Sequence, residues 1–192
     1  MLQPELSHFL SQYAHIPEQV LLEFTASFKE KKIAKNSFLL KEGHVCRHFG
    51  FVKSGCLRLY YTGEKQEVSV WFAFSNNSAI EISSYLSNAP SAYAIQAIED
   101  STVLYLPKEE LETLCAKHPA LQEMMRRYWE VAVLSLITRF TSLQKDSAEK
   151  RYKDLLHQTE YLQKIPQKYL ASFIGVTPTS LSRIRKQAGK SN

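Results

Sequence analysis

The chain has 192 residues, of which 44% are hydrophobic and 22% are charged, and its formal net charge is +5. This composition is ordinary for a globular protein with one sizeable core and a small second domain, and it argues against a disordered chain. No run of about 18 apolar residues is present, and the first residues lack the pattern of a signal peptide, so we expect neither a membrane span nor secretion. The odd number of cysteines fits neither a disulfide framework nor a tetrahedral zinc site, and a reducing, cytoplasmic location is the simplest expectation.

Residues 5–28 contain two apolar-periodic segments that Pro17 separates, and we expect two short helices there. From Lys29 to Pro107 the pattern changes to short runs rich in Phe, Tyr, Val and Ile, several of them alternating with period two. Turn residues recur about every ten positions between these runs, which favours an antiparallel sandwich or jelly roll. The expected strands are 37–41, 49–53, 56–61, 67–72, 94–98 and 102–106.

A short helical segment at 108–114 precedes a long helix that we expect from Pro119 to about Gln144, because this stretch has no internal Gly or Pro. Apolar side chains recur along the long helix every three or four residues, close to the heptad seam of a coiled coil. This seam could pack on the chain's own sheet or pair with a second copy of the chain. It consists of Leu121, Met125, Tyr128, Ala132, Leu136, Phe140 and Leu143.

The segment 165–187, which a helix over 147–157 precedes, predicts two short helices joined by a tight turn. Gly175 follows the first helix, expected over 167–174, and accepts a left-handed backbone at low cost. Thr177 is a natural N-cap, and Pro178 suits the first position of the second helix. A helix, a Gly-containing turn and a helix form the helix-turn-helix signature. The second helix would turn Leu181 and Ile184 inward and Thr179, Ser182, Arg183, Arg185 and Lys186 outward.

Charge is distributed unevenly along the chain. From Arg139 onward there are 11 Lys and Arg against 4 Asp and Glu, a net charge of +7, and no acidic residue follows Glu160. A cationic segment of this kind favours contact with the phosphates of nucleic acid, although a solvated basic tail would have the same composition. Because a helix-turn-helix protein commonly reads two half-sites with two copies, we favour the homodimer for the long helix.

A β-sandwich of this size, a long connecting helix and a C-terminal helix-turn-helix together resemble the Crp/Fnr transcription regulators. The segments 147–152, 165–171 and 175–186 resemble a short-bodied branch of that family. The resemblance implies an α+β fold: a β-roll similar to a cyclic nucleotide-binding domain over 1–118, a dimerisation helix over 119–145 and a DNA-binding domain over 146–192. It also implies double-stranded DNA as a partner, a small-molecule effector, RNA polymerase as a candidate partner, and no enzymatic activity.

Matched position by position, the resemblance makes Thr179, Ser182 and Arg183 face the bases, with Arg183 suited to a guanine. Usual members carry a β-hairpin wing, for which the linker 158–164 is too short, so we expect a smaller DNA footprint. The resemblance places the remaining expected DNA-binding residues on phosphates or at the start of the second helix: Arg185, Lys186, Lys168 and Thr177.

Cyclic-nucleotide-binding members of the family have a Gly-Glu-Leu segment whose Glu binds the ribose and a downstream Arg that binds the cyclic phosphate. The matching segment 79–82 keeps Glu81, whereas Ser91 stands at the Arg position. No Lys or Arg lies between Lys65 and Lys108 to replace it, so we expect an effector other than cyclic AMP. Glu81 could equally be an ordinary strand-end carboxylate. The expected pocket residues are Glu81, Ser91, Tyr93 and Tyr85, with the two tyrosines near the mouth.

No cofactor is expected. An iron–sulfur cluster needs about four thiolates, whereas this chain has Cys46, Cys56 and Cys115 only. His44 and His48 flank Cys46 in a region of loop and strand, which is a weak pattern for a metal or haem. The sequence contains neither a phosphate-cradling Gly loop nor a G-x-S-x-G motif, so no such motif points to an enzyme. Two alternatives stay open: a ligand-binding β-roll whose basic tail binds a protein or RNA, and a cupin-like metalloenzyme.

Overall fold

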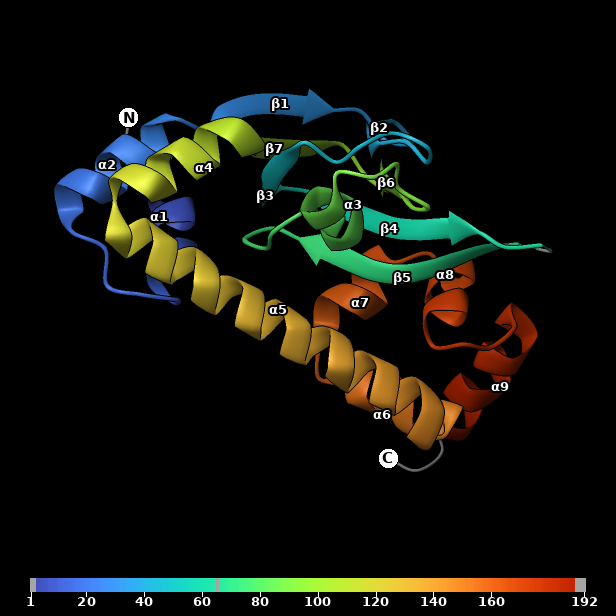
Figure 1. Ribbon diagram of the computed structural model, residues 1–192. Helices are drawn as coiled ribbons and strands as arrows, with labels where there is room; N and C mark the ends of the chain where they lie inside the picture. Colours follow the sequence, from blue (N-terminus) through green and yellow to red (C-terminus); the bar gives the residue numbers. More distant parts are fainter. Residues whose placement is uncertain (1–2, 65, 189–192) are drawn as a thin grey trace. The chain divides into compact units, whose positions relative to one another are not determined.

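The computed structural model describes residues 3–64 and 66–188, which form helices and two antiparallel sheets (Figure 1). Helices α1 (Pro4–Ser11) and α2 (Glu18–Ala26) lie on either side of Pro17, as predicted. One sheet has the strand order β1-β7-β3 and the other has the order β2-β6-β4-β5. The strands are β1 (Lys29–Ile33), β2 (Phe38–Leu40), β3 (His48–Ser54), β4 (Cys56–Thr62), β5 (Glu67–Phe74), β6 (Ala94–Ala97) and β7 (Ser101–Pro107).

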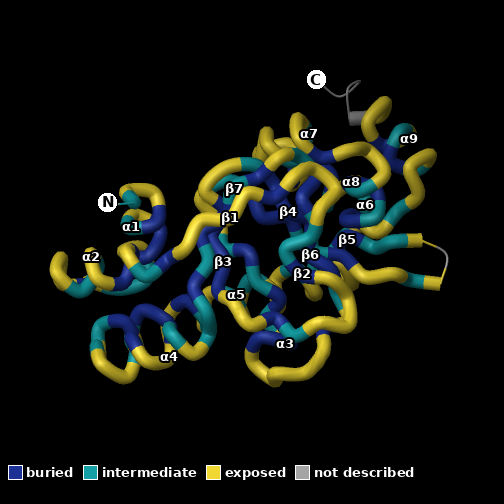
Figure 2. Tube along the Cα trace, turned by 90° about the horizontal axis from the view of Figure 1, so that it is seen from above, coloured by how far each residue is buried: buried dark blue, intermediate teal, exposed yellow. Residues whose placement is uncertain are grey.

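The β-rich pattern of the sequence is confirmed, and each of the six expected strands corresponds to one of β2 to β7. Strand β1 was not predicted, because its sequence Lys-Glu-Lys-Lys-Ile lacks apolar alternation and only Ile33 is buried. It lies at the edge of its sheet and pairs with β7 from Lys29 opposite Tyr105 to Ile33 opposite Ser101. Charged side chains on an edge strand discourage pairing with another chain, so the charge has a structural reason. Figure 2 shows β1 largely exposed and β3 largely buried.

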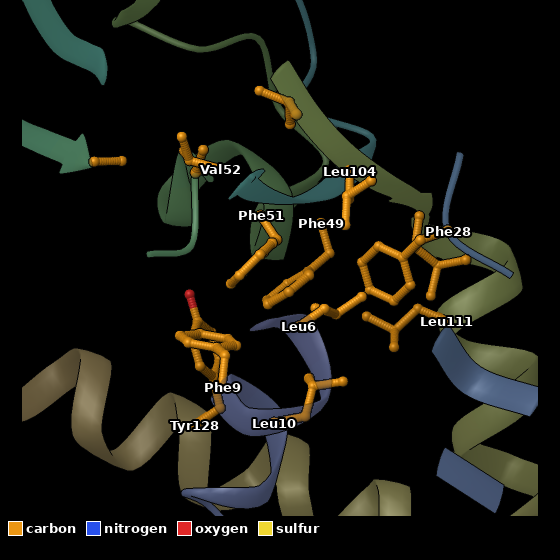
Figure 3. Packing of buried hydrophobic residues seen from close by; sticks show 14 of the residues in the cluster. Leu6, Phe9, Leu10, Phe28, Phe49, Phe51, Val52, Leu104, Leu111 and Tyr128 are labelled. Carbon is orange, nitrogen blue, oxygen red and sulfur yellow. The ribbon is translucent and has the colours of Figure 1, made fainter. Parts of the chain in front are cut away.

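The main core lies between the β1-β7-β3 sheet and the helices that cover its outer face (Figure 3). Phe49 and Phe51 of β3 project from this sheet toward Phe9 of α1, and the ring centroids of Phe9 and Phe51 are 5.3 Å apart. Tyr128 closes the cluster, with its ring 5.2 Å from Phe49 and its hydroxyl donating to Ser78 Oγ at 2.8 Å. A cluster of this many aromatic rings contributes strongly to stability because each buries a large apolar area.

The C-terminal half of the chain is helical. It contains α4 (Lys108–Lys117), α5 (Pro119–Lys145), α6 (Ala148–Leu156), α7 (Thr159–Lys164), α8 (Gln167–Phe173) and α9 (Pro178–Ala188), while α3 (Ile82–Ser87) lies between β5 and β6. The linker 158–164, which was expected to be too short for a hairpin, forms helix α7 over most of its length. Tyr161 of α7 packs against Phe173, with ring centroids 5.4 Å apart, and this tertiary contact has no signal in the local sequence. No helix in residues 3–64 and 66–188 has the length and apolarity to cross a membrane.

The chain divides into two compact units, and α5 contributes to both. The first consists of residues 1–59 and 72–132, and the second consists of residues 60–71 and 133–192. The tip formed by the ends of β4 and β5 therefore belongs with the C-terminal helices and not with the rest of the β-roll.

The expected apolar seam of helix α5 is buried at its N-terminal end and exposed toward its C-terminal end. Leu121, Met125 and Tyr128 of the expected seam, together with Met124, are buried in the core of the first unit. Further along α5, the apolar side chains are exposed. This exposed stripe, called the α5 stripe below, consists of Val133, Leu136, Ile137, Phe140 and Leu143.

Candidate functional site

The turn between α8 and α9 has the geometry expected of a helix-turn-helix. Gly175 has a φ of +75°, the left-handed conformation that glycine adopts without steric cost. The Val176 N–H donates to the Ala171 carbonyl at 2.9 Å and the Gly175 N–H donates to the Ser172 carbonyl at 3.2 Å. This pair of hydrogen bonds is the Schellman motif, which satisfies the last carbonyls of α8 and reverses the chain.

Thr177 is the N-cap of α9, as predicted. Its Oγ1 accepts from the Ser180 N–H at 3.2 Å, and its carbonyl accepts from the Leu181 N–H at 3.0 Å. Pro178 is the first helical residue, where a missing N–H leaves no hydrogen bond unmade. Leu181 and Ile184 are buried, as expected, so the orientation of α9 about its own axis is fixed.

Two arginines that the charge pattern had grouped with the DNA-binding cations are structural. Arg151 of α6 donates through Nε to the Ile174 carbonyl at 2.9 Å and through Nη1 to the Asp146 carbonyl at 2.5 Å. Arg139 of α5 donates to the Phe173 carbonyl and lies 3.6 Å from the centroid of the Phe173 ring. Both guanidiniums thus meet carbonyls at the C-terminal ends of helices, where positive charge is favoured.

Burial of the Arg139 guanidinium lowers the pKa of this side chain to about 10. Through these hydrogen bonds, Arg139 and Arg151 connect α5 and α6 to the end of α8. Their charge is therefore directed inward and does not form part of an outer cationic surface. The sequence showed the charge of this segment but not the direction in which each cation points.

The outer face of α9 presents polar and cationic side chains to solvent. Thr179, Arg183 and Lys186 are exposed and follow one another at helical spacing. With about 100° per residue, these three residues lie opposite the buried pair Leu181 and Ile184, whereas Arg185 lies toward the flank. The remaining expected DNA-binding residues, Lys168 at the start of α8 and Thr177, are exposed as well.

Ser182 is half-buried and less available than expected. Its hydroxyl accepts from Gln167 Nε2 at 2.6 Å and donates to the Pro178 carbonyl at 3.1 Å. Gln167 also reaches the Pro178 carbonyl at 3.3 Å, so this amide connects the start of α8 with the first turn of α9. No local pattern in the sequence indicates this role of Gln167, because its partners lie 11 and 15 residues away across the turn.

The second unit also contains a contact between the β4–β5 tip and α8. The Ser69 N–H of β5 donates to Ser172 Oγ at 3.1 Å, and the Ser172 hydroxyl lies 2.9 Å from Ser69 Oγ. Ser69 is buried, so these hydrogen bonds are shielded from water. Within the second unit, the β4–β5 tip is thus hydrogen-bonded to α8.

In the β-roll, Glu81 is buried and is the N-cap of α3. Its carboxylate accepts from the Ser83 N–H at 3.0 Å, the Ser83 hydroxyl at 2.8 Å and the Ser84 N–H at 2.9 Å. The Ser91 hydroxyl donates to the same carboxylate at 2.9 Å. A carboxylate has about four acceptor positions, so the groups that would bind a nucleotide's ribose and phosphate are already engaged with one another.

The two expected pocket tyrosines differ in position. Tyr85 is 3% exposed and belongs to the core cluster, which is not the position expected at a pocket mouth. Its ring packs against Trp129, with centroids 5.7 Å apart, and Lys108 Nζ lies 5.0 Å from the ring centroid. Burial raises the pKa of the Tyr85 hydroxyl. Tyr93 is half-buried, and its N–H donates to Ser91 Oγ at 3.0 Å.

The cysteines and histidines do not assemble a metal centre in the part of the chain that the structure describes. No group of three or more His, Cys, Asp or Glu side chains there could hold a metal ion. The three cysteines form no disulfide in the part of the chain that the structure describes, and burial raises the pKa of Cys46 and raises that of Cys115 to about 11.

Comparison with known proteins agrees with this geometry. Residues 30–118 match the family described as the cyclic nucleotide-binding domain. The sequence matches no curated protein at a significant level. The fold is similar to that of FixK2 from Bradyrhizobium japonicum, with a TM-score of 0.72 and 16% identity over 85% of each chain.

Two further solved structures share the fold. A CooA variant from Carboxydothermus hydrogenoformans has a TM-score of 0.69 and 20% identity, and the match covers 88% of this chain and 79% of that chain. A protein from Eubacterium rectale that is described as a putative transcriptional regulator of the Crp/Fnr family has a TM-score of 0.69 and 14% identity, with 92% of this chain and 85% of that chain covered. The resemblance found in the sequence is thus confirmed at the level of the fold: residues 30–118 match the cyclic nucleotide-binding domain, and the chain has the fold of the Crp/Fnr regulators.

Proposed function

We propose that this protein is a Crp/Fnr-type transcription regulator that binds duplex DNA sequence-specifically as a homodimer. The observation that carries the proposal is the outer face of α9. It places Thr179, Arg183 and Lys186 in solvent, on a helix that the buried Leu181 and Ile184 fix in a helix-turn-helix. The second helix of this motif is the one that enters the major groove.

The directions of the side chains separate base readout from phosphate contact. Arg183 lies on the outermost face, where a guanidinium can form two hydrogen bonds to the O6 and N7 of a guanine. Arg185 lies toward the flank of α9, and Lys168 lies at the start of α8, so both suit phosphate oxygens on either side of the groove. Ser182 contributes through its contact with Gln167, which supports the first turn of α9.

The α5 stripe supports a dimer. Val133, Ile137 and Phe140 recur at helical spacing and are 51%, 54% and 62% exposed. An apolar stripe of this kind on a long helix is expected to be covered, and a second copy of the helix covers it with the geometry of a coiled coil. Two copies would present two reading helices to two half-sites, in a symmetric site.

The experiment that tests this function selects binding sites from random duplex DNA at about 150 mM salt, since affinity without a stated salt concentration has no meaning. A palindrome with half-sites about 10 base pairs apart is expected from a two-fold reader. Recovery of no common sequence, both with and without cell extract as a source of effector, would contradict sequence-specific binding.

Two matched arginine variants refine the test. Arg183→Gln should change the selected sequence at one position of each half-site and cost about 1–3 kcal/mol at the original site. Arg185→Gln should weaken all sequences to a similar extent and reduce the slope of affinity against salt. If the two variants behave alike, α9 does not read bases through Arg183.

The dimer has a separate test. Phe140→Glu places a charge in the centre of the α5 stripe and should convert a dimer to a monomer in analytical ultracentrifugation. Thr138→Glu, at an exposed position of the same helix outside the stripe, is the control. A wild-type monomer at micromolar concentration, or a dimer that tolerates Phe140→Glu, would exclude this interface.

A further inference from the structure

The β-roll contains a pocket that is separate from Glu81 and Ser91. Its volume is about 270 Å³, and it lies between β2, the loop that precedes β3, and residues of β3, β6 and β7. We propose that this pocket binds a small organic anion with a planar apolar body, either a carboxylate or a phosphate ester. The proposal concerns ligand binding alone and goes beyond the proposed DNA-binding function, so it does not depend on that function.

The charged side chains that line the pocket favour an anion. Lys41, Arg47, His44 and His48 line the pocket, and the described residues that line it include no Asp or Glu. Lys29 and Lys31 of β1 add to the positive potential, because together with burial they lower the pKa of His48. Cations in a partly enclosed site attract anions more strongly than the same cations on an open surface.

The second argument is the apolar part of the lining. Leu40 and Ile95 are buried there, and Phe38 and Tyr105 are half-buried aromatic side chains. His48 and Tyr105 meet edge to face, with ring centroids 5.1 Å apart. A pocket with an apolar lining and a few polar groups is typical of small-molecule sites, and its volume is near the lower end of their range, ~300 Å³.

Gly50 of β3 contributes by its lack of a side chain. A Cβ at this position would lie 2.5 Å from the carbonyl oxygen of Ala79, which also lines the pocket. The Ala79 N–H donates to the Gly50 carbonyl at 2.8 Å. The two backbones therefore form a fixed part of the pocket wall, and the site is formed in advance of any ligand.

The loop that carries the cations is connected to the segment that the sequence analysis had assigned to an effector. The Gly43 N–H donates to the Ser91 carbonyl at 2.7 Å, and the Ser91 N–H donates to the His44 carbonyl at 3.0 Å. The Cys46 N–H donates to Ser84 Oγ at 2.9 Å. A ligand that draws Lys41 and Arg47 together would act directly on the hydrogen bonds that hold α3 and Ser91.

Direct ligand binding to the full chain tests the proposal. The probes are phenyl phosphate, benzoate, inorganic phosphate and benzyl alcohol, titrated at constant ionic strength and followed by the ¹H–¹⁵N NMR signals of the residue 41–50 amides and of the His44 and His48 rings. Phenyl phosphate, benzoate or both should bind saturably, and at least about tenfold more tightly than inorganic phosphate or benzyl alcohol. Which aromatic anion binds better then distinguishes a phosphate ester from a carboxylate.

Matched variants locate the site. Arg47→Gln and Lys41→Gln should each weaken the aromatic anion at least about fivefold, because each removes a charge-assisted contact. Lys53→Gln removes an exposed cation at the other end of β3 and should leave the affinity unchanged. The proposal fails if neither aromatic anion binds, if inorganic phosphate or benzyl alcohol binds as tightly, or if Lys53→Gln has the same effect as Arg47→Gln.

Discussion

The helix-turn-helix and the Glu81 region both contain dense polar networks, but they differ in what they leave exposed. Around α8 and α9, the side chains of Arg139, Arg151 and Gln167 satisfy carbonyls and hold the helices together, while Arg183 on the outer face remains in solvent. Around α3, the Glu81 carboxylate is itself the centre of the network and is buried. A binding face needs internal hydrogen bonds that hold its helices in place, and it also needs exposed groups. Only the region around α8 and α9 combines the two.

The difference between the two regions predicts how substitutions in each should affect stability and DNA sequence preference. Substitutions that remove internal hydrogen bonds around α8 and α9 should lower stability and leave the DNA sequence preference intact. Substitutions on the outer face of α9 should change the sequence preference and leave stability intact. Substitutions in the α3 region, where the polar groups are engaged with one another, should change stability only.

Glu81→Ala should have the largest effect, a loss of about 2–4 kcal/mol in the free energy of unfolding. The N-cap of α3 accounts for about 0.5–2 kcal/mol of this loss, and the buried donors left without an acceptor account for the rest. Chemical denaturation measures it, and Glu64→Ala, at an exposed position, should change stability by less than about 0.5 kcal/mol. If Glu81→Ala were neutral for stability yet abolished a ligand response, Glu81 would belong to a binding site after all.

Arg151→Ala should destabilise the second unit by about 2–3 kcal/mol, because its guanidinium donates to carbonyls at the ends of two helices. Lys153→Ala removes an exposed cation from the same helix and is the control. Hydrogen exchange resolves the two units and should show the loss in residues 133–188. At temperatures where the variant stays folded, its selected DNA sequence should be unchanged; an altered sequence would place Arg151 on DNA.

Local signals made the helix-turn-helix predictable from the sequence. Gly175, Thr177 and Pro178 each favour one backbone conformation, and together they define where one helix ends and the next begins. The strands β2 to β7 were predictable for a similar reason, since alternation of apolar residues directly reflects a half-buried sheet.

The parts that were not predictable depend on contacts between distant residues. The charge of Arg139 was visible, but its direction depends on the Phe173 ring and carbonyl that it meets in the folded chain. Glu81 and Ser91 were both expected in an effector pocket, but the sequence did not show that the Ser91 hydroxyl donates to the Glu81 carboxylate. The apolar period of α5 was correct, but a period does not tell which part of the stripe the chain covers by itself.

Gly175→Ala should cost about 1–2 kcal/mol in unfolding free energy, because a side chain in the left-handed region is strained. A Cβ would have room, since the nearest atoms are Arg151 Nη2 at 3.6 Å and Leu143 Cδ2 at 3.8 Å. The cost is therefore one of backbone conformation, and Gly175→Asn should cost less than Gly175→Ala. Equal costs for both variants would point to a steric cause instead.

Ser172→Ala should cost about 1 kcal/mol, the usual net worth of a hydrogen bond. The more specific readout is hydrogen exchange of the Ser69 amide, which should accelerate because its acceptor, Ser172 Oγ, is removed. Thr138→Ala, at an exposed position, should leave that amide unaffected. An unchanged Ser69 exchange rate would show that the β4–β5 tip does not hold α8 in solution.

The smallest effect concerns His48, whose pKa lies below 6.5 because of burial first and of Lys31 and Lys29 second. The folded protein therefore binds this proton less readily than the unfolded chain does. As pH falls from about 6.5 toward the folded pKa, stability decreases, and it is not recovered at lower pH.

Lys31→Gln should raise the pKa of His48 in an NMR titration of the imidazole, whereas Lys32→Gln should do so less, since Lys32 projects from the opposite face of β1. An aromatic anion in the pocket should raise the same pKa, because a negative charge favours the protonated ring. If neither Lys31→Gln nor the anion moves it, the positive potential at this pocket is too weak to select a ligand by charge.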